Sequence, residues 1–196
     1  MDLTIKRATS DQAHFIARIV MGALGEELCY ELAGPTKNLD DVSALFTDLA
    51  RNPLSQYSYK NTLIACVESG APIGGIVAYD GALLHRLRKA FVPAANRYLG
   101  WNITENSMAE WGDETGPEQI YIDSLFVEPS FRGKGVASAL FNSVFQRYAH
   151  YCKPFGLLVE PENRTAQKLY EKLGFHRNGE SNFFSTPMLK MTKNLR

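Results

Sequence analysis

Apolar residues recur along this chain with two different periods, and segments of the two kinds follow one another. Helical spacing appears at Phe15, Ile16, Val20 and Leu24, after a Ser10-Asp11 pair in which either residue can cap the helix. Runs rich in Ile, Val and Ala predict strands instead, and residues 61–68 and 72–79, joined by Ser-Gly-Ala, predict a β-hairpin. Further strands are expected over residues 3–8, 120–127, 156–160 and 187–193, and further helices over 39–51, 82–99, 134–150 and 163–173. This order predicts a mixed sheet with α/β crossovers.

Residues 100–118 fit neither period. They mix two tryptophans, Trp101 and Trp111, with turn-forming residues, which predicts an irregular excursion rather than a regular element. No linker or repeat interrupts the rest, so we expect a single domain over residues 1–196. Residues 81–118 then form an excursion on the substrate side of that domain, and the tryptophans are candidates for a pocket wall or a peptide-docking surface.

Composition narrows the classes of function. The chain has 196 residues, 45% hydrophobic, with 21 basic residues balanced by 21 acidic ones, so no global charge favours nucleic acid. Cys29, Cys66 and Cys152 show no metal-type pairing, which favours reduced thiols and argues against zinc. Charged residues interrupt the first twenty positions, so they form neither a signal peptide nor a membrane span. We expect a cytoplasmic protein without a metal or a membrane partner. An oligomeric state is not predicted.

The most distinctive segment is SFRGKGVASA, residues 130–139, which carries two glycines where a strand gives way to a helix. The first turn of a helix has unpaired N–H groups and a positive dipole end, and glycines let an anion approach that backbone closely. Arg132 and Lys134 add positive charge. A Walker loop is excluded because Glu128 and Gly135 occupy its required positions, and a Rossmann fingerprint is excluded by Ser138. The segment predicts a phosphate cradle of another kind, the alternative being an ordinary turn with two solvated basic side chains.

The letters R-x-x-G-x-A, at Arg132, Gly135 and Ala137, resemble the GCN5-related N-acetyltransferase (GNAT) family. The resemblance continues in N-x-x-A-x-x-x-Y-x-x-x-G-F, from Asn163 through Tyr170 to Phe175. It implies a mostly antiparallel central sheet flanked by helices, and acetyl-coenzyme A as cosubstrate with no metal. The coenzyme residues that it implies are Leu125, Phe126 and Val127 at the strand end, Arg132, Gly133, Lys134, Gly135, Val136 and Ala137 around the pyrophosphate, and Asn163 at the pantetheine arm. Asn163 can also simply cap its helix.

Two residues are candidates for proton transfer. Tyr170 shares an apolar helical face with Ala166, Leu169 and Leu173, so a core tyrosine is one interpretation. The resemblance implies another, in which its hydroxyl protonates the departing thiolate. Asp123 interrupts a strand that is apolar on both faces, because Ile120, Ile122 and Phe126 alternate with Tyr121, Leu125 and Val127. It is either a structural carboxylate or, at a position that is acidic in some family members, the general base, with Glu160 as the second choice.

These observations favour an N-acetyltransferase in which an amine attacks acetyl-coenzyme A directly, in a ternary complex. The acceptor amine can belong to a small molecule or to a protein. A non-catalytic module that binds acyl-coenzyme A for sensing or assembly is the alternative. The basic run HRLRK at residues 85–89 is interpreted as a solvated helix face, and Glu26, Glu27 and Glu31 as surface charge near the acceptor side.

Overall fold

A computed structural model describes residues 2–183 and 186–194, and the strands of these residues form one seven-stranded sheet. Its order is β1-β2-β3-β4-β5-β7-β6, and every neighbouring pair is antiparallel except β4 and β5, which are parallel. The strands are β1 (Leu3–Arg7), β2 (Thr62–Val67), β3 (Pro72–Asp80), β4 (Ile120–Val127), β5 (Phe155–Val159), β6 (His176–Phe183) and β7 (Thr186–Lys193). The expectation of a mixed, mostly antiparallel sheet is confirmed.

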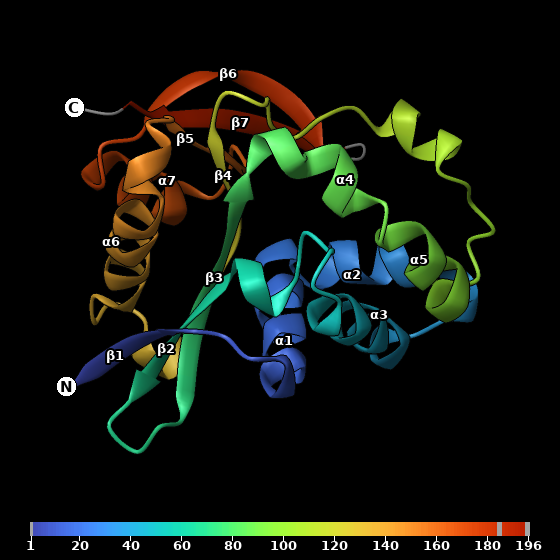
Figure 1. The fold of residues 1–196 in the computed structure, drawn as a ribbon, viewed down its shortest axis with the longest axis horizontal. Coiled ribbons are helices and arrows are strands. Elements are labelled where there is room, and N and C mark those ends of the chain that lie inside the picture. The colour runs from blue at the N-terminus through green and yellow to red at the C-terminus, as the bar shows by residue number, and fades with distance from the viewer. Residues whose placement is uncertain (1, 184–185, 195–196) are drawn as a thin grey trace.

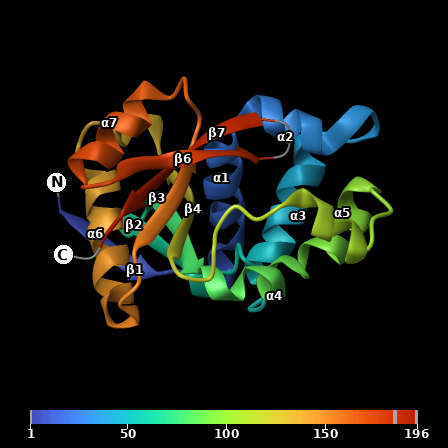
Figure 2. The same ribbon diagram turned by 90° about the horizontal axis from the view of Figure 1, so that it is seen from above.

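Helices cover both faces of the sheet (Figures 1 and 2). One core lies between the sheet and α1, α2, α3 and α5, and a second core lies between the sheet and α6, with α7 at its margin. The α-helices are α1 (Ala13–Leu24), α2 (Glu26–Ala33), α3 (Leu39–Arg51), α4 (Leu84–Arg88), α5 (Phe91–Leu99), α6 (Val136–Tyr148) and α7 (Arg164–Lys172). Strand β4 is the central strand of the sheet and contributes residues to both cores, Phe126 to the first and Ile120, Ile122, Leu125 and Val127 to the second.

The structure adds two elements that the hydrophobic pattern did not predict. Helix α2 is only eight residues long, and glycines with positive φ, Gly25 and Gly34, stand at its two ends. Strand β6 has the sequence HRNGESNF, which lacks alternating apolar residues because it is an exposed edge strand that pairs only with β7.

Two expected boundaries also change. The N-terminal cap is Thr9 rather than Ser10 or Asp11, and it begins a short 3-10 turn ahead of α1 through a reciprocal bond with Gln12. The helix expected over residues 82–99 is divided into α4 and α5.

Strand β4 contains the irregularity on which the site depends. On the β3 side, Ile122 pairs with Ala78 and Ser124 with Val77, so Asp123 is the extra residue of a β-bulge. The bulge reverses the alternation, because Ile122 and Leu125 then contribute to the same core, on the α6 side. The sequence-based expectation that Phe126 shares a face with Ile122 is therefore wrong, since Phe126 packs on the α1 side.

Candidate active site

The predicted phosphate cradle is a turn that leads from β4 into α6. Gly133 and Gly135 have φ angles of +73° and +82°, in the left-handed region that favours glycine. A Cβ atom added at either glycine would meet no atom within 4 Å beyond its chain neighbours, so the space beside the turn is open at both positions. Gly135 is also the N-cap of α6 and brings no side chain to bond the first-turn N–H groups, which begin at Val136 and Ala137. These N–H groups are therefore available to a phosphate, and the residues fit the pyrophosphate of a coenzyme.

The two basic side chains of the cradle have different surroundings. Arg132 donates from Nε to the Val127 carbonyl oxygen at 3.0 Å, which ties the turn to the end of β4. The Lys134 ammonium lies over the Phe131 ring, 5.2 Å from its centroid. Both side chains are exposed, so both can add positive charge at the mouth of the cradle.

Beside the cradle, β4 separates from its parallel neighbour. Pairing between β4 and β5 ends at Ile122 and Leu157, whereas β4 continues to Val127 along β3. Residues 123–127 of β4 therefore have one backbone edge that does not pair with β5. Leu125, Phe126 and Val127, predicted to bind the coenzyme arm, lie along this edge and are partly buried.

Asp123 stands where the two strands separate. Its Oδ1 accepts a bond from Ser124 Oγ at 2.7 Å, and its Oδ2 accepts from the Tyr79 hydroxyl at 3.4 Å and from Gln56 Nε2 at 3.5 Å. Burial, and then the negative charge of Glu114, raise the pKa of Asp123 to about 7, while the three hydrogen bonds act in the opposite direction. A carboxylate with this pKa is suited to accept a proton at neutral pH.

Glu114 reaches this group from the excursion over residues 81–118. It forms an ion pair with Arg88, and its Oε1 accepts a bond from the Tyr79 hydroxyl at 3.2 Å. Arg88 also donates to the Gly112 carbonyl oxygen at 2.8 Å and is only 6% exposed. The interpretation of the HRLRK run as a solvated face is therefore wrong for Arg88. It holds for His85, Arg86 and Lys89, which are exposed. The sequence held a signal, because Arg88 follows Leu84 and Leu87 at helical spacing on the buried face.

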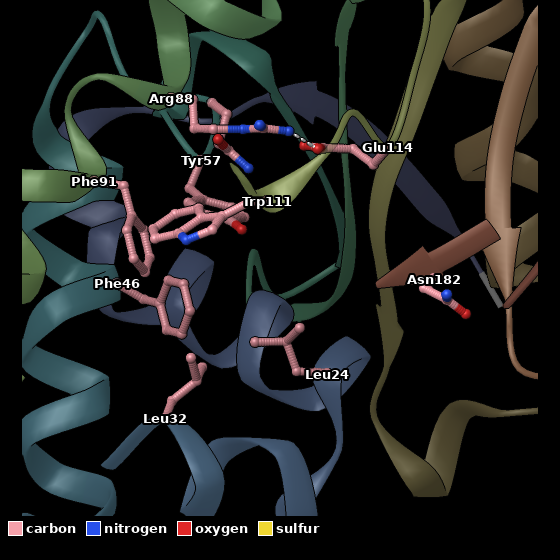
Figure 3. Close-up of a pocket in the computed structure, with 10 residues that line it drawn as sticks. Leu24, Leu32, Phe46, Tyr57, Arg88, Phe91, Trp111, Glu114 and Asn182 are labelled. Atoms are coloured by element: carbon pink, nitrogen blue, oxygen red, sulfur yellow. Dashed lines mark hydrogen bonds and ion pairs between the residues drawn. The ribbon is translucent and has the colours of Figure 1, made fainter. Parts of the chain in front are cut away.

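Asp123, Tyr79, Gln56, Glu114 and Arg88 form the Asp123 cluster. A cavity of about 220 Å³ opens on the α1 side of this cluster. In Figure 3, the side chains of Phe46, Phe91 and Trp111 stand together along one wall, and the Arg88–Glu114 ion pair lies above them. The lining residues come from helices, loops and β6, and they are Leu24, Leu32, Phe46, Gln56, Tyr57, Arg88, Phe91, Trp111, Glu114 and Asn182. Trp111 thus lines a pocket as the sequence suggested, whereas Trp101 packs behind it, with its ring centroid 6.4 Å away. Glu26, Glu27 and Glu31 are exposed on α2.

Tyr170 lies on α7 against the α6 core. Its ring packs edge-on to Phe141, with centroids 5.6 Å apart, and lies 6.1 Å from the ring of Phe175. Burial raises its pKa to about 12, so the phenol keeps its proton at neutral pH. No described residue hydrogen-bonds the hydroxyl. The packing that the sequence suggested is present, and the hydroxyl remains free to donate.

Glu160 directly follows β5, and Asn163 is the N-cap of α7. The Asn163 side chain caps α7 by accepting the Ala166 N–H at 3.1 Å, which leaves its own amide N–H groups for a ligand. Glu160 is exposed, and its backbone carbonyl oxygen accepts a bond from Gln167 Nε2 at 3.0 Å. Glu160 follows the end of β5 and makes none of the described contacts of Asp123, which lies in β4, so the structure does not join the two candidate bases in one cluster.

Comparison with known sequences shows the family to which the chain belongs. The sequence profile of the acetyltransferase (GNAT) family matches residues 29–175. The chain belongs to this family. A relative with a curated function, the spermine/spermidine N(1)-acetyltransferase of Bacillus subtilis (strain 168), is 28% identical over 152 residues, which cover 74% of this acetyltransferase and 88% of the relative.

Solved structures agree on the fold of this acetyltransferase. A crystal structure of an acetyltransferase superimposes with a TM-score of 0.75 at 21% identity, covering 98% of this chain and 100% of the other. The NatC complex bound to Gag peptide and CoA contains a chain that superimposes with a TM-score of 0.59 at 20% identity, with both chains fully covered. Among the described helices, none is both long and apolar enough to span a membrane.

The cradle predicts a loss of coenzyme binding in Gly135→Glu. A carboxylate at this N-cap would occupy the anion's position and repel it, so calorimetry should show acetyl-coenzyme A affinity reduced by at least about 100-fold. Gly100→Glu is the matched control, because Gly100 also has a left-handed backbone with no atom within 4 Å of an added Cβ. It lies at the end of α5, across the molecule from α6 (Figures 1 and 2). Wild-type affinity for acetyl-coenzyme A in both variants would exclude the cradle as the coenzyme site.

The Asp123 cluster predicts a shift in pH dependence in Glu114→Gln. Loss of the Glu114 charge removes one cause that raises the Asp123 pKa, so this pKa should fall below 7. A base must be deprotonated to act, so the acidic limb of the kcat/KM profile, expected near pH 7, should move to lower pH. Glu118→Gln removes the same charge from an exposed residue of this segment and should leave the limb in place. An unchanged limb in Glu114→Gln would argue that Asp123 is not the titrating group.

Proposed function

We propose that this protein transfers an acetyl group from acetyl-coenzyme A to a small primary amine, by direct attack of the amine in a ternary complex. The observation that carries the proposal is the position of Asp123, a carboxylate with a pKa of about 7. It stands at the junction between an unpaired strand edge that leads to the cradle and a cluster of side chains that opens on the cavity. Coenzyme and acceptor would approach Asp123 from these two sides.

Asp123 acts as the general base. An alkylammonium with a pKa near 10 is almost wholly protonated at neutral pH and cannot attack a thioester until it loses a proton. Ionised Asp123 takes this proton, directly or through water. The neutral nitrogen then forms a bond with the thioester carbon, and the backbone edge at Leu125 and Val127 holds the pantetheine arm and polarises the carbonyl group.

Tyr170 acts as the general acid. When the carbon–sulfur bond breaks, the electron pair goes to sulfur and the Tyr170 hydroxyl donates a proton to it. The second proton leaves the amine nitrogen as the amide forms and restores the phenol. Two protons have then left the ammonium group, one on Asp123 and one on the thiol. With a pKa of about 12 the phenol is a weaker acid than a free tyrosine, so donation must accompany rather than precede the cleavage.

The acceptor is proposed to be a small amine because the cavity is small and mostly apolar. A volume of about 220 Å³ admits a short alkyl chain, and carboxylates lie at only one end of it. A cation with an apolar chain suits this arrangement. The curated relative named for spermine and spermidine supports the same class. A panel should therefore begin with polyamines and alkylamines, followed by amino acids, an aminoglycoside and a peptide N-terminus, with coenzyme release and product mass as readouts.

The alternative is a non-catalytic module that only binds acyl-coenzyme A. Such a module needs the cradle but has no need of a half-buried carboxylate that contacts three polar side chains next to an acceptor-sized cavity. Turnover of any amine in the panel favours the enzyme. Binding of acetyl-coenzyme A without turnover of any of them favours the module.

Asp123→Asn should retain coenzyme affinity and lose about 100-fold in turnover at neutral pH, since an amide cannot accept the ammonium proton. The loss should diminish at high pH, where more of the amine is already neutral. Turnover is measured from pH 6 to 10 beside Glu160→Gln. If Asp123→Asn keeps full activity over this range while Glu160→Gln loses it, Glu160 is the base.

Tyr170→Phe should retain the ring packing on Phe141 and lose about 100-fold in turnover, because only the transferable proton is removed. Tyr148→Phe is the matched control, since the Tyr148 hydroxyl donates to the Ala78 carbonyl oxygen at 2.7 Å inside the core. That change should lower the melting temperature but spare turnover. Wild-type turnover in Tyr170→Phe would identify Tyr170 as a packing residue only.

A further inference from the structure

One buried polar atom at the cavity has no partner within the described residues. Gln56, in the loop between α3 and β2, is 6% exposed and lines the cavity. Its carbonyl oxygen Oε1 is buried and accepts no hydrogen bond there. A buried acceptor without a donor is costly and uncommon in folded proteins. Its place at the cavity suggests that a ligand supplies the missing donor.

The orientation of the Gln56 amide follows from its neighbour. Nε2 lies 3.5 Å from Asp123 Oδ2. An N–H group is attracted to a carboxylate, whereas a carbonyl oxygen in its place would be repelled once Asp123 is ionised. Asp123 thus fixes the amide with Oε1 turned away from it.

The loop itself is held firmly. Asn61 Nδ2 donates to the backbone carbonyl oxygens of Ser55 and Gln56 at 3.1 and 3.0 Å, and the Tyr57 N–H donates to Ser55 Oγ at 3.1 Å. With the backbone fixed, the burial of the Gln56 side chain and its Nε2 contact with Asp123 limit the rotation by which Oε1 could find another partner. The unpartnered oxygen is therefore a feature of the folded cavity rather than of a loose side chain.

We propose that Gln56 binds the acceptor nitrogen and makes the site specific for primary amines. The inference rests on the proposed function. A neutral primary amine has two N–H groups beside its lone pair. One is donated to Gln56 Oε1 and the other to Asp123, and the lone pair is left for the thioester carbon. N-methylation replaces one of these N–H groups with a carbon that neither oxygen can bond, so a secondary amine leaves a buried acceptor unpaired.

The test compares each primary amine that the wild type acetylates with its N-methyl derivative, beginning with 1,4-diaminobutane and N,N′-dimethyl-1,4-diaminobutane. The readout is the ratio of the two kcat/KM values, since a general loss of folding or activity cancels from it. Gln56→Met keeps the length of the side chain but removes both polar atoms. It should narrow the primary-to-secondary ratio by about tenfold, which corresponds to about 1.4 kcal/mol, without changing the KM for acetyl-coenzyme A.

Two further variants serve as controls. Gln56→Glu keeps an acceptor oxygen, so it should retain a ratio close to that of the wild type even if its total activity falls. It also supplies the test if Gln56→Met does not fold. Gln167→Met removes a glutamine of similar burial, 8% exposed, on α7 away from the cavity. That variant should lower the melting temperature and leave the ratio unchanged.

The possible outcomes separate this inference from the proposed function. A ratio that narrows in Gln56→Met and is retained in Gln56→Glu supports the inference. A wild-type protein that acetylates primary amines, with the same ratio in Gln56→Met, overturns the role of Gln56 and leaves the proposed function standing. The role of Gln56 is likewise overturned if Gln56→Met does not fold and Gln56→Glu narrows the ratio as far as a loss of the acceptor would. If the wild type binds acetyl-coenzyme A but acetylates no amine, the proposed function fails, and the inference fails with it.

Discussion

The site depends on one constraint, which is that a carboxylate is placed where the central sheet separates. Up to Ile122, β4 pairs with strands on both sides, and beyond it only the β3 side remains. The bulge at Asp123 occurs at this point, and it reverses which core the later residues of β4 face. An acidic residue at Ile120 or Ile122, earlier in this strand, would be enclosed by the apolar α6-side core. At the bulge it can collect hydrogen-bond donors and still reach the space between the strands.

The positive charge near Asp123 is paired with Glu114 rather than with Asp123, and this arrangement keeps the pKa of Asp123 near neutrality. Arg88 pairs with Glu114 and not with Asp123, so this buried cation compensates the neighbouring acid. The Tyr79 hydroxyl contacts both carboxylates but has a single proton to donate. Among the described residues Asp123 therefore receives neutral donors only, and burial and the Glu114 charge prevail over them. Direct pairing of Arg88 with Asp123 would have lowered the pKa of Asp123 and made it less suited to the proposed role of a base.

The sequence could predict the parts of the site that are local. The predicted cradle lies within a few consecutive residues, so two glycines at a strand-to-helix junction suffice to predict an open turn there. Asp123 was recognisable because it breaks an apolar strand, although the bulge that follows from it was not. Gln56, Tyr79 and Glu114 carried no such signal, since their role arises from contacts with residues 35 to 67 positions away. Helix α2 and strand β6, which contribute Leu32 and Asn182 to the cavity, were missed because short or edge elements carry little periodicity.

The composition of the cavity bears on whether the acetyl group passes through the protein. A covalent route requires a nucleophile at the acceptor site that is activated by a base. Of the described residues that line the cavity, only Tyr57 carries a hydroxyl and none carries a thiol or an amine. Burial raises the pKa of Tyr57 well above its usual value, with Asp123 and Glu114 adding to the effect, so its phenolate is scarce at neutral pH. Ser124 is buried beside Asp123 and donates to it, but a carboxylate with a pKa of about 7 is far too weak to ionise a serine hydroxyl appreciably. An alkylammonium, about three pKa units above the same carboxylate, is a much more accessible proton source. The cluster is thus better matched to deprotonating the acceptor than to generating a nucleophile of its own, which favours direct transfer.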